Sequence, residues 1–278
     1  MNALIIGSLL LVCTALVWIL PTMGPGALVM CAAVSAPTIV LLARTREERT
    51  FLLRIFILGL MVRMMLATVI YMGHMEEFFG GDANTYDSYG QSLLQGLHGD
   101  GYHMQKYQGF IASGAGAWGM LYLVAGIYET VGRNLFAVQL VNASIGAATG
   151  LVVYYTAMTL FDNVRVAKLA AILVVFFPSL ILWSSQALKD GLIILALAIS
   201  ILATLRLMEK ITVKWVVIIT VSLLTLLSLR FYIFYMMTAA VAGSFIIGMK
   251  SLSAQSFLQR FIAVAAIGMA FTWFGVLQ

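Results

Sequence analysis

The chain has 278 residues, of which 62% are hydrophobic and only 10% are charged, with a formal net charge of +5. A soluble domain carries about 25% charged residues, so this composition excludes a soluble protein. The apolar residues gather in repeated blocks of about 17–25 residues, the length that a helix needs to cross a membrane. The sequence therefore predicts an all-α polytopic membrane protein. The basic charge follows from membrane topology, and no nucleic-acid partner is predicted.

The apolar blocks divide the chain into three parts. They run at about 3–20, 25–43, 51–73, 109–128, 134–160, 166–186, 190–208, 213–229, 231–249 and 259–277. Residues 1–50 form a predicted hairpin with an Arg-rich loop, and residues 51–210 form a core with a polar loop over 74–108. Residues 211–278 supply additional transmembrane helices.

The weakly apolar block 109–128 decides the topology. If it does not cross, eleven Lys and Arg residues lie inside and four outside; if it crosses, seven lie inside and eight outside. Cytoplasmic loops carry the excess of Lys and Arg, so the first topology is favoured. We predict about nine spans, with 109–128 interfacial or re-entrant on the outer face and the N-terminus in the cytoplasm. The expected location is a bacterial inner membrane.

The polar loop is the main functional lead. Five of the eleven carboxylates lie between Glu76 and Asp100, and all three histidines lie in or beside this interval. Asn84 is a predicted N-cap of a short helix over 85–95 that Gly96 closes. Tyr86, Tyr89 and Leu93 recur on one face of this helix, as suits the headgroup level of a membrane.

Several charged residues lie inside predicted membrane spans or directly between them, where a charge is costly. Arg63 lies in the middle of a predicted span, where it is either paired for folding or part of a functional site. Lys189 and Asp190 lie between two blocks, as a self-neutralising turn or as a phosphate site on the outer face. Arg230 is another outer cation, as an interfacial anchor or as a member of the same site.

Two stretches carry a resemblance to a known group. GGDANTYDSYGQSLLQG (80–96) follows an apolar helix, and FFPSLILWSSQALKDG (176–191) joins two later blocks. Together with the blocks around them, over roughly 51–210, they resemble the core module of the GT-C membrane glycosyltransferases, such as the protein O-mannosyltransferase-like and aminoarabinose transferase-like families. In that group an outer-loop Asp follows the first core helix, and a Pro-Ser helix leads to a second acidic residue.

The resemblance implies transfer of a sugar from a polyprenyl phosphate to a glycan, lipid or protein acceptor on the external face. Asp82 would be the general base and Asp190 the second acidic catalytic residue. Lys189 and Arg230 would hold the lipid phosphate. The other residues predicted to bind the donor are Arg133, Arg63 and Tyr86.

Two other functions stay open. One is the handling of lipid-linked glycans without transfer, as a flippase, ligase or polymerase partner. The other is secondary transport, which the absence of an internal repeat disfavours. No cofactor is required by any motif, and the histidine spacing does not match a metal site. A divalent metal beside Asp82, Asp87 and Asp190 stays open.

Overall fold

The computed structural model describes residues 3–45, 48–78, 81–113, 117–247 and 262. Within these ranges the chain is helical, as predicted, and no strand is present. The helices of the described ranges are α1 (Ala3–Ile19), α2 (Gly24–Arg44), α3 (Arg49–Met72), α4 (Asp82–Leu97), α5 (Gly101–Ala112), α6 (Trp118–Val131), α7 (Leu135–Phe161), α8 (Val164–Phe176), α9 (Pro178–Ser184), α10 (Asp190–Glu209), α11 (Val213–Leu229) and α12 (Phe231–Ile247).

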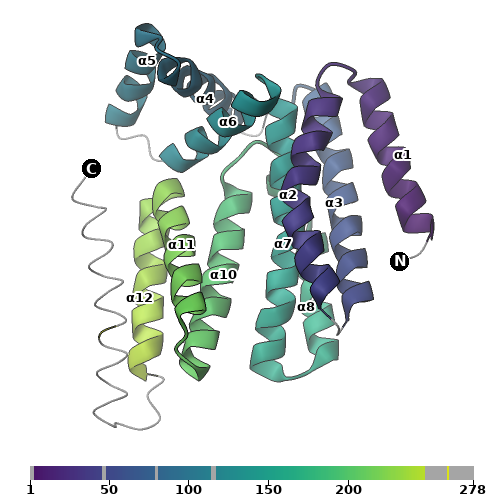
Figure 1. Ribbon diagram of the computed structural model, residues 1–278, viewed down its shortest axis with the longest axis vertical. Helices are drawn as coiled ribbons and strands as arrows, with labels where there is room; N and C mark the ends of the chain where they lie inside the picture. The colour runs from purple at the N-terminus through teal and green to yellow at the C-terminus, as the bar shows by residue number, and fades with distance from the viewer. Residues whose placement is uncertain (1–2, 46–47, 79–80, 114–116, 248–261, 263–278) are drawn as a thin grey trace.

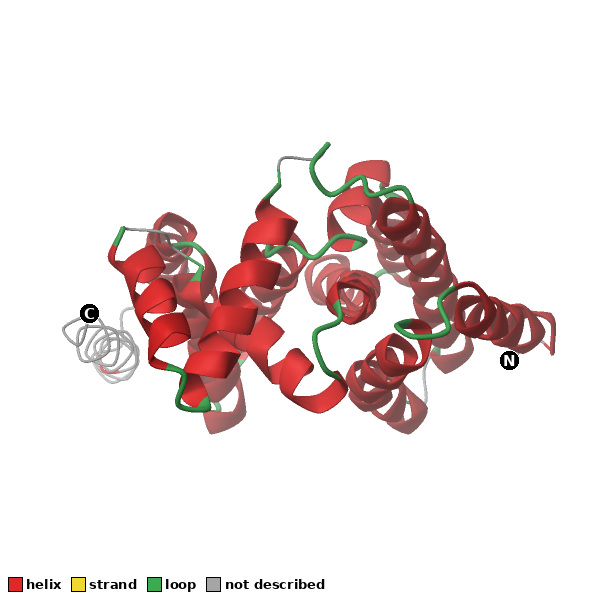
Figure 2. Ribbon diagram, turned by 90° about the horizontal axis from the view of Figure 1, so that it is seen from above, coloured by secondary structure: helices red, strands yellow, loops and turns green. Residues whose placement is uncertain are grey.

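The helices form a bundle with a layer across one end (Figure 1). Helices α1–α3, α7, α8 and α10–α12 lie side by side, whereas α4, α5 and α6 lie across one end, above the side of the bundle that holds α10–α12. We call α4–α6 the cap layer; Figure 2 shows it from above. The junctions α2–α3, α7–α8 and α10–α11 lie at the opposite end, which we call the far end.

Four helices in the described ranges, α2, α3, α7 and α10, are long and apolar enough to cross a membrane. Helices α8 and α9 add a fifth candidate if they count as one span bent by 53°. Helices α1, α11 and α12 are apolar but have 17 residues each, about 26 Å of helix against a hydrocarbon core of about 30 Å. The class of helical membrane protein is therefore confirmed, whereas nine spans stay a prediction. The predicted block 259–277 lies outside the described residues except for residue 262.

The segment 109–128 does not form one helix. Helix α5 ends at Ala112 and α6 begins at Trp118, and both belong to the cap layer (Figure 1). With 12 and 14 residues, neither helix is long enough to span a membrane. This agrees with the prediction that the segment does not cross.

Helix α7 is the centre of the bundle. It packs against α2, α3, α8 and α10, and small residues on its surface let these neighbours approach closely. A Cβ on Gly150 would lie 2.2 Å from Val175 Cγ2 of α8, and one on Gly146 would lie 2.4 Å from Ser184 Cβ of α9. The two glycines therefore set how deeply the bent pair α8–α9 packs into the bundle.

The predicted start of the helix in the polar loop is wrong. Helix α4 begins at Asp82, and its N-cap is Gly81, not Asn84, in a left-handed conformation with φ 72°. Glycine adopts this conformation at no steric cost, so the chain turns directly into the helix at Asp82. The helix runs past Gly96 to Leu97, with His98 as its C-cap.

The aromatic stripe of α4 faces protein rather than the headgroup level of a membrane. Tyr86 and Leu93 are buried, and Tyr89 stacks on Phe110 of α5 with ring centroids 3.9 Å apart. Helix α4 also packs against α6. The stripe therefore assembles the cap layer.

Candidate functional site

A cavity of about 370 Å³ lies where the cap layer meets the bundle. Three of its lining residues, Asp82, Asp190 and Arg230, are polar residues that the sequence singled out. They come from the start of α4, the start of α10 and the α11–α12 junction. The remaining lining residues are Ser179, Leu180, Trp183, Leu188 and Ile194. The cavity thus has a charged side and an apolar side.

Both carboxylates of the cavity occupy the first position of a helix. Asp82 begins α4 and Asp190 begins α10. The N-terminal end of a helix carries a partial positive charge and unpaired N–H groups, which favour a carboxylate or a phosphate nearby. The folding of these two helices therefore positions anionic side chains where an anionic substrate would also be favoured.

Arg230 contacts both Asp190 and Tyr232. Its guanidinium lies 3.6 Å from Asp190 Oδ1, and its other terminal nitrogen donates a hydrogen bond of 2.7 Å to the Tyr232 hydroxyl. Both members of the ion pair keep about a third of their side-chain surface exposed. Such a pair is weak, so a phosphate entering the cavity can compete with Asp190 for Arg230.

Lys189 lies beside the cavity rather than in its lining. Its ammonium lies 5.5 Å from the centroid of the Tyr86 ring. Burial lowers the pKa of Lys189, and the positive charge of Arg230 lowers it further, while Asp82 and Asp190 act in the opposite direction. The ammonium therefore belongs to the same electrostatic cluster as Asp82, Asp190 and Arg230.

Tyr86 connects Lys189 to Asp82. Burial raises the pKa of its phenol well above the ordinary value, and the Asp82 and Asp190 carboxylates raise it further. A hydrogen bond to Asp82 acts in the same direction. Tyr86 is thus a neutral hydroxyl near neutral pH, and it can hold the Asp82 side chain.

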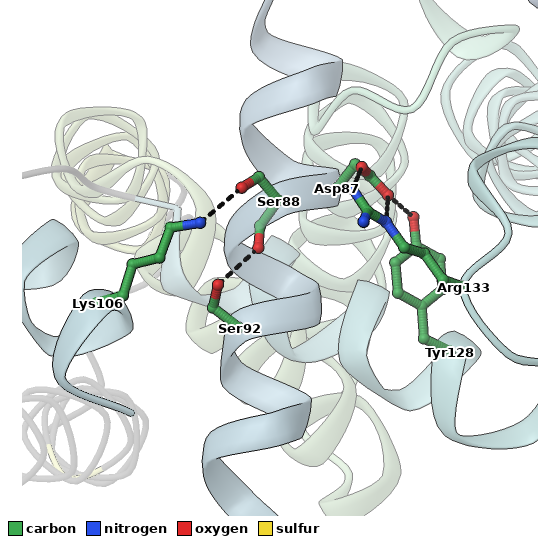
Figure 3. A network of polar contacts seen from close by, with 6 residues as sticks. All are labelled: Asp87, Ser88, Ser92, Lys106, Tyr128 and Arg133. Atoms are coloured by element: carbon green, nitrogen blue, oxygen red, sulfur yellow. Dashed lines mark hydrogen bonds and ion pairs between the residues drawn. The ribbon is translucent and has the colours of Figure 1, made fainter. Parts of the chain in front are cut away.

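Arg133 does not reach the cavity. Its guanidinium forms a two-pronged ion pair with Asp87 of α4, in which Nε donates to Oδ1 over 3.1 Å and a terminal nitrogen contacts Oδ2 (Figure 3). The Tyr128 hydroxyl of α6 donates to the same carboxylate over 2.6 Å. Asp87 and Arg133 therefore tie α4 to α6 and to the segment before α7. Figure 3 also shows Lys106 of α5 bonded to Ser88 of α4.

Arg63 is buried in the bundle beneath the cavity. Its Nε donates to Ser184 Oγ over 2.8 Å, and one terminal nitrogen donates to the carbonyls of Gly59 and Val175 over 3.0 and 2.9 Å. Pro178 begins α9 and has no N–H to continue the α8 ladder, so carbonyls at the end of α8 need other donors. Arg63 supplies one of them. The sequence left two roles for Arg63, pairing for folding or membership of a functional site. The contacts support pairing for folding.

Sequence reasoning missed the residue that holds the loop before Asp190. Asn142 of α7 donates two hydrogen bonds from Nδ2, to the carbonyls of Gln186 and Leu188, over 2.7 and 2.6 Å. The signal was an amide in the apolar block 134–160, because a polar group inside a span must find partners. Trp183 and Leu180 were missed as well, since lining residues of this kind carry no motif.

The described part of the chain contains no group of three or more His, Cys, Asp or Glu residues that could hold a metal ion. Asp87 is held by Arg133 and Tyr128, and it does not line the cavity with Asp82 and Asp190.

Fold and site together define an all-helical membrane protein with a polar cavity at one end of the bundle. Comparison of the chain with protein-family models, with curated proteins and with solved structures gives no match.

Proposed function

We propose that this protein is a membrane glycosyltransferase with a GT-C-like core, which moves a sugar from a polyprenyl-phosphate donor to an acceptor. One observation carries the proposal: Asp82, Asp190 and Arg230, far apart in the sequence, line a single cavity. A lipid-phosphate donor is already activated, so its enzyme needs a base for the acceptor and cations for the leaving phosphate. The residues of this cavity can serve both needs.

The distribution of charge supports an external position for this cavity. Helix α2 ends at Arg44, α3 begins at Arg49, and Arg206 lies in the last turn of α10. All three helix ends lie at the far end of the bundle (Figure 1). Because cytoplasmic loops carry the excess of Lys and Arg, the far end faces the cytoplasm in our proposal. The cavity then opens to the outer face, and the chain crosses the membrane about nine times.

In the proposed reaction, Asp82 accepts the proton of the acceptor hydroxyl or amine as that group attacks the anomeric carbon of the donor sugar. The bond between this carbon and the phosphate oxygen breaks, and its electron pair stays on the lipid phosphate. Arg230 and Lys189 stabilise the negative charge that the leaving phosphate gains. Trp183, Leu180 and Ile194 form the apolar side of the cavity, where the first isoprene units would lie.

A lipid-binding role without transfer is the second candidate, since the pair of Arg230 with Asp190 is weak enough for a phosphate to displace Asp190 and be held. The two functions differ in their dependence on Asp82. Capture needs the cations alone, whereas transfer also needs the base.

Arg230→Ala is expected to weaken binding of polyprenyl phosphate by about 10–100-fold, because a charge-assisted hydrogen bond contributes about 1.5–3 kcal/mol. The measurement is the Kd of the purified protein for polyprenyl phosphate. Lys106→Ala is the matched control, since it removes another cation that lies on the cap layer and contacts Ser88. Equal affinity of Arg230→Ala and the unaltered protein would exclude Arg230 as the phosphate ligand.

The pH dependence of donor binding is expected to depend on Lys189. Its pKa is lowered from 10.5, so the ammonium is lost at a lower pH than that of an exposed lysine. Donor affinity should therefore fall as the pH rises on the alkaline side. Lys189→Arg keeps its charge over this range and should flatten the fall, whereas Lys106→Arg should not change it. Parallel profiles for the unaltered protein and Lys189→Arg would contradict the role of Lys189.

A further inference from the structure

A second cavity lies in the part of the bundle nearest the far end. Its volume is about 650 Å³, and it shares no lining residue with the cavity at the cap layer. Its walls come from α2, α7 and α10, and the start of α11 adds two further lining residues. We call it the far-end groove. We infer that the far-end groove binds an anionic phospholipid of the surrounding membrane leaflet.

The walls of the far-end groove are apolar. Leu41 of α2, Leu151 of α7 and Ile199 of α10 are representative, and Leu41 exposes 65% of its surface. The groove lies between three of the helices that are long and apolar enough to cross a membrane. In a membrane the medium around such helices is lipid, so an acyl chain is the natural occupant of an open apolar groove at this depth.

One part of the groove carries cations and hydroxyl groups. Arg206 comes from the last turn of α10 and Lys214 from the first turn of α11, and Thr45 and Tyr155 add hydroxyls. Basic pockets between transmembrane helices bind the head groups of anionic lipids. Trp215 also lines this part, and its ring lies 5.2 Å from the Lys214 ammonium. Tryptophan is enriched at the level where head groups begin.

Arg206 forms an ion pair with Glu209 but can still bind a lipid phosphate. Arg206 donates to Glu209 over 3.1 Å, and the side chains keep 36% and 53% of their surface exposed. Exposed pairs of this kind are weak, so a lipid phosphate can replace Glu209. Lys214 adds a second positive charge to the same part of the groove. Two cations against one carboxylate leave a site with a preference for anions.

The chemistry of the groove predicts how it selects a lipid. Moving an acyl chain from the bilayer into an apolar groove gains little, because lipid tails are as apolar as the groove. Selectivity must then come from the head group. The groove should therefore prefer phosphatidylglycerol to phosphatidylcholine, and this preference should depend on Arg206 and Lys214.

The test uses the full chain, purified from mixed micelles with equal amounts of phosphatidylglycerol and phosphatidylcholine, and counts retained lipids by native mass spectrometry. We expect about tenfold preference for phosphatidylglycerol, and its loss in the double variant Arg206→Ala with Lys214→Ala. The control is Arg49→Ala with Arg165→Ala, which removes two exposed cations that do not line the groove. No preference in the unaltered protein, or equal loss in the control, would overturn the inference.

A second variant tests the apolar wall without changing charge. Ala148 of α7 lines the groove, so Ala148→Phe should fill it and reduce retained phosphatidylglycerol by about tenfold, an order-of-magnitude expectation for losing the site. Val221→Phe adds the same ring at an exposed position of α11 outside the groove and should change nothing. Displacement of phosphatidylglycerol by equimolar polyprenyl phosphate would overturn the assignment of the occupant. The inference needs no transfer activity, so failure of the proposed function leaves it standing.

Discussion

Asp82→Asn is expected to lower the rate of sugar transfer by about 10²–10⁴-fold, the usual contribution of a general base. The amide keeps the shape of the side chain at the start of α4 but cannot accept the acceptor's proton. Binding of polyprenyl phosphate should persist, because Arg230 and Lys189 are unchanged. The measurement is transfer from a polyprenyl-phosphate sugar in a purified assay, together with the Kd for polyprenyl phosphate.

Asp100→Asn is the matched control for this substitution. Asp100 is the N-cap of α5, where its carboxylate accepts from the backbone N–H groups of Tyr102 and His103, and asparagine can cap in the same way. The control therefore removes an acidic charge from the cap layer without altering the cavity. Undiminished transfer by Asp82→Asn would end the catalytic role of Asp82. If the unaltered protein bound polyprenyl phosphate but transferred no sugar, the non-catalytic function would be favoured.

The residues around the cavity could be found from the sequence because an apolar chain has few places for charge. Asp82 stood in the one long polar loop and Asp190 and Arg230 stood at the edges of apolar blocks, and the predicted topology assigned all three to one face. The structure brings them to one cavity. Their catalytic roles stay predictions, because geometry alone does not identify a base.

Pairing between side chains could not be predicted in the same way. Arg133 was assigned to the donor, yet it pairs with Asp87, whose carboxylate also accepts a hydrogen bond from Tyr128. The sequence contains both charges but not the crossing of α4 and α6 that brings them together. The N-cap was missed for a local reason: Gly81 adopts the left-handed conformation, and it enters the helix earlier than an asparagine cap at 84 would.

The bend within one apolar block could not be predicted from the blocks alone. The block 166–186 reads as one continuous stretch, but the chain bends by 53° between α8 and α9. Pro178 ends the helical ladder there, and α9 then contributes Leu180 and Trp183 to the cavity. The bend therefore creates part of the site.

Gly146→Ala is expected to lower the free energy of unfolding by about 2–4 kcal/mol, because it overpacks the contact between α7 and α9 and weakens a hydrogen bond. The new Cβ would lie 2.4 Å from Ser184 Cβ and Oγ and 2.9 Å from Arg63 Nε. Ser184 must then move away from Arg63, and the Nε–H group of Arg63 would be left buried without its acceptor. The measurement is the free energy of unfolding in a denaturing-detergent titration. Transfer should fall in parallel, because α9 lines the cavity.

Gly126→Ala is the control, since a Cβ at that position of α6 meets nothing within 4 Å; this change should be neutral or slightly stabilising. Adding Ser184→Gly to Gly146→Ala removes the two Ser184 atoms that clash and should recover most of the loss that overpacking causes, while Arg63 Nε stays 2.9 Å from the new Cβ. The remainder then combines the lost hydrogen bond between Arg63 and Ser184, the remaining contact with Arg63 and the low helix propensity of glycine. If Gly146→Ala is as stable as the unaltered protein, α9 does not pack against α7 at this depth, and the apolar side of the cavity must be built differently.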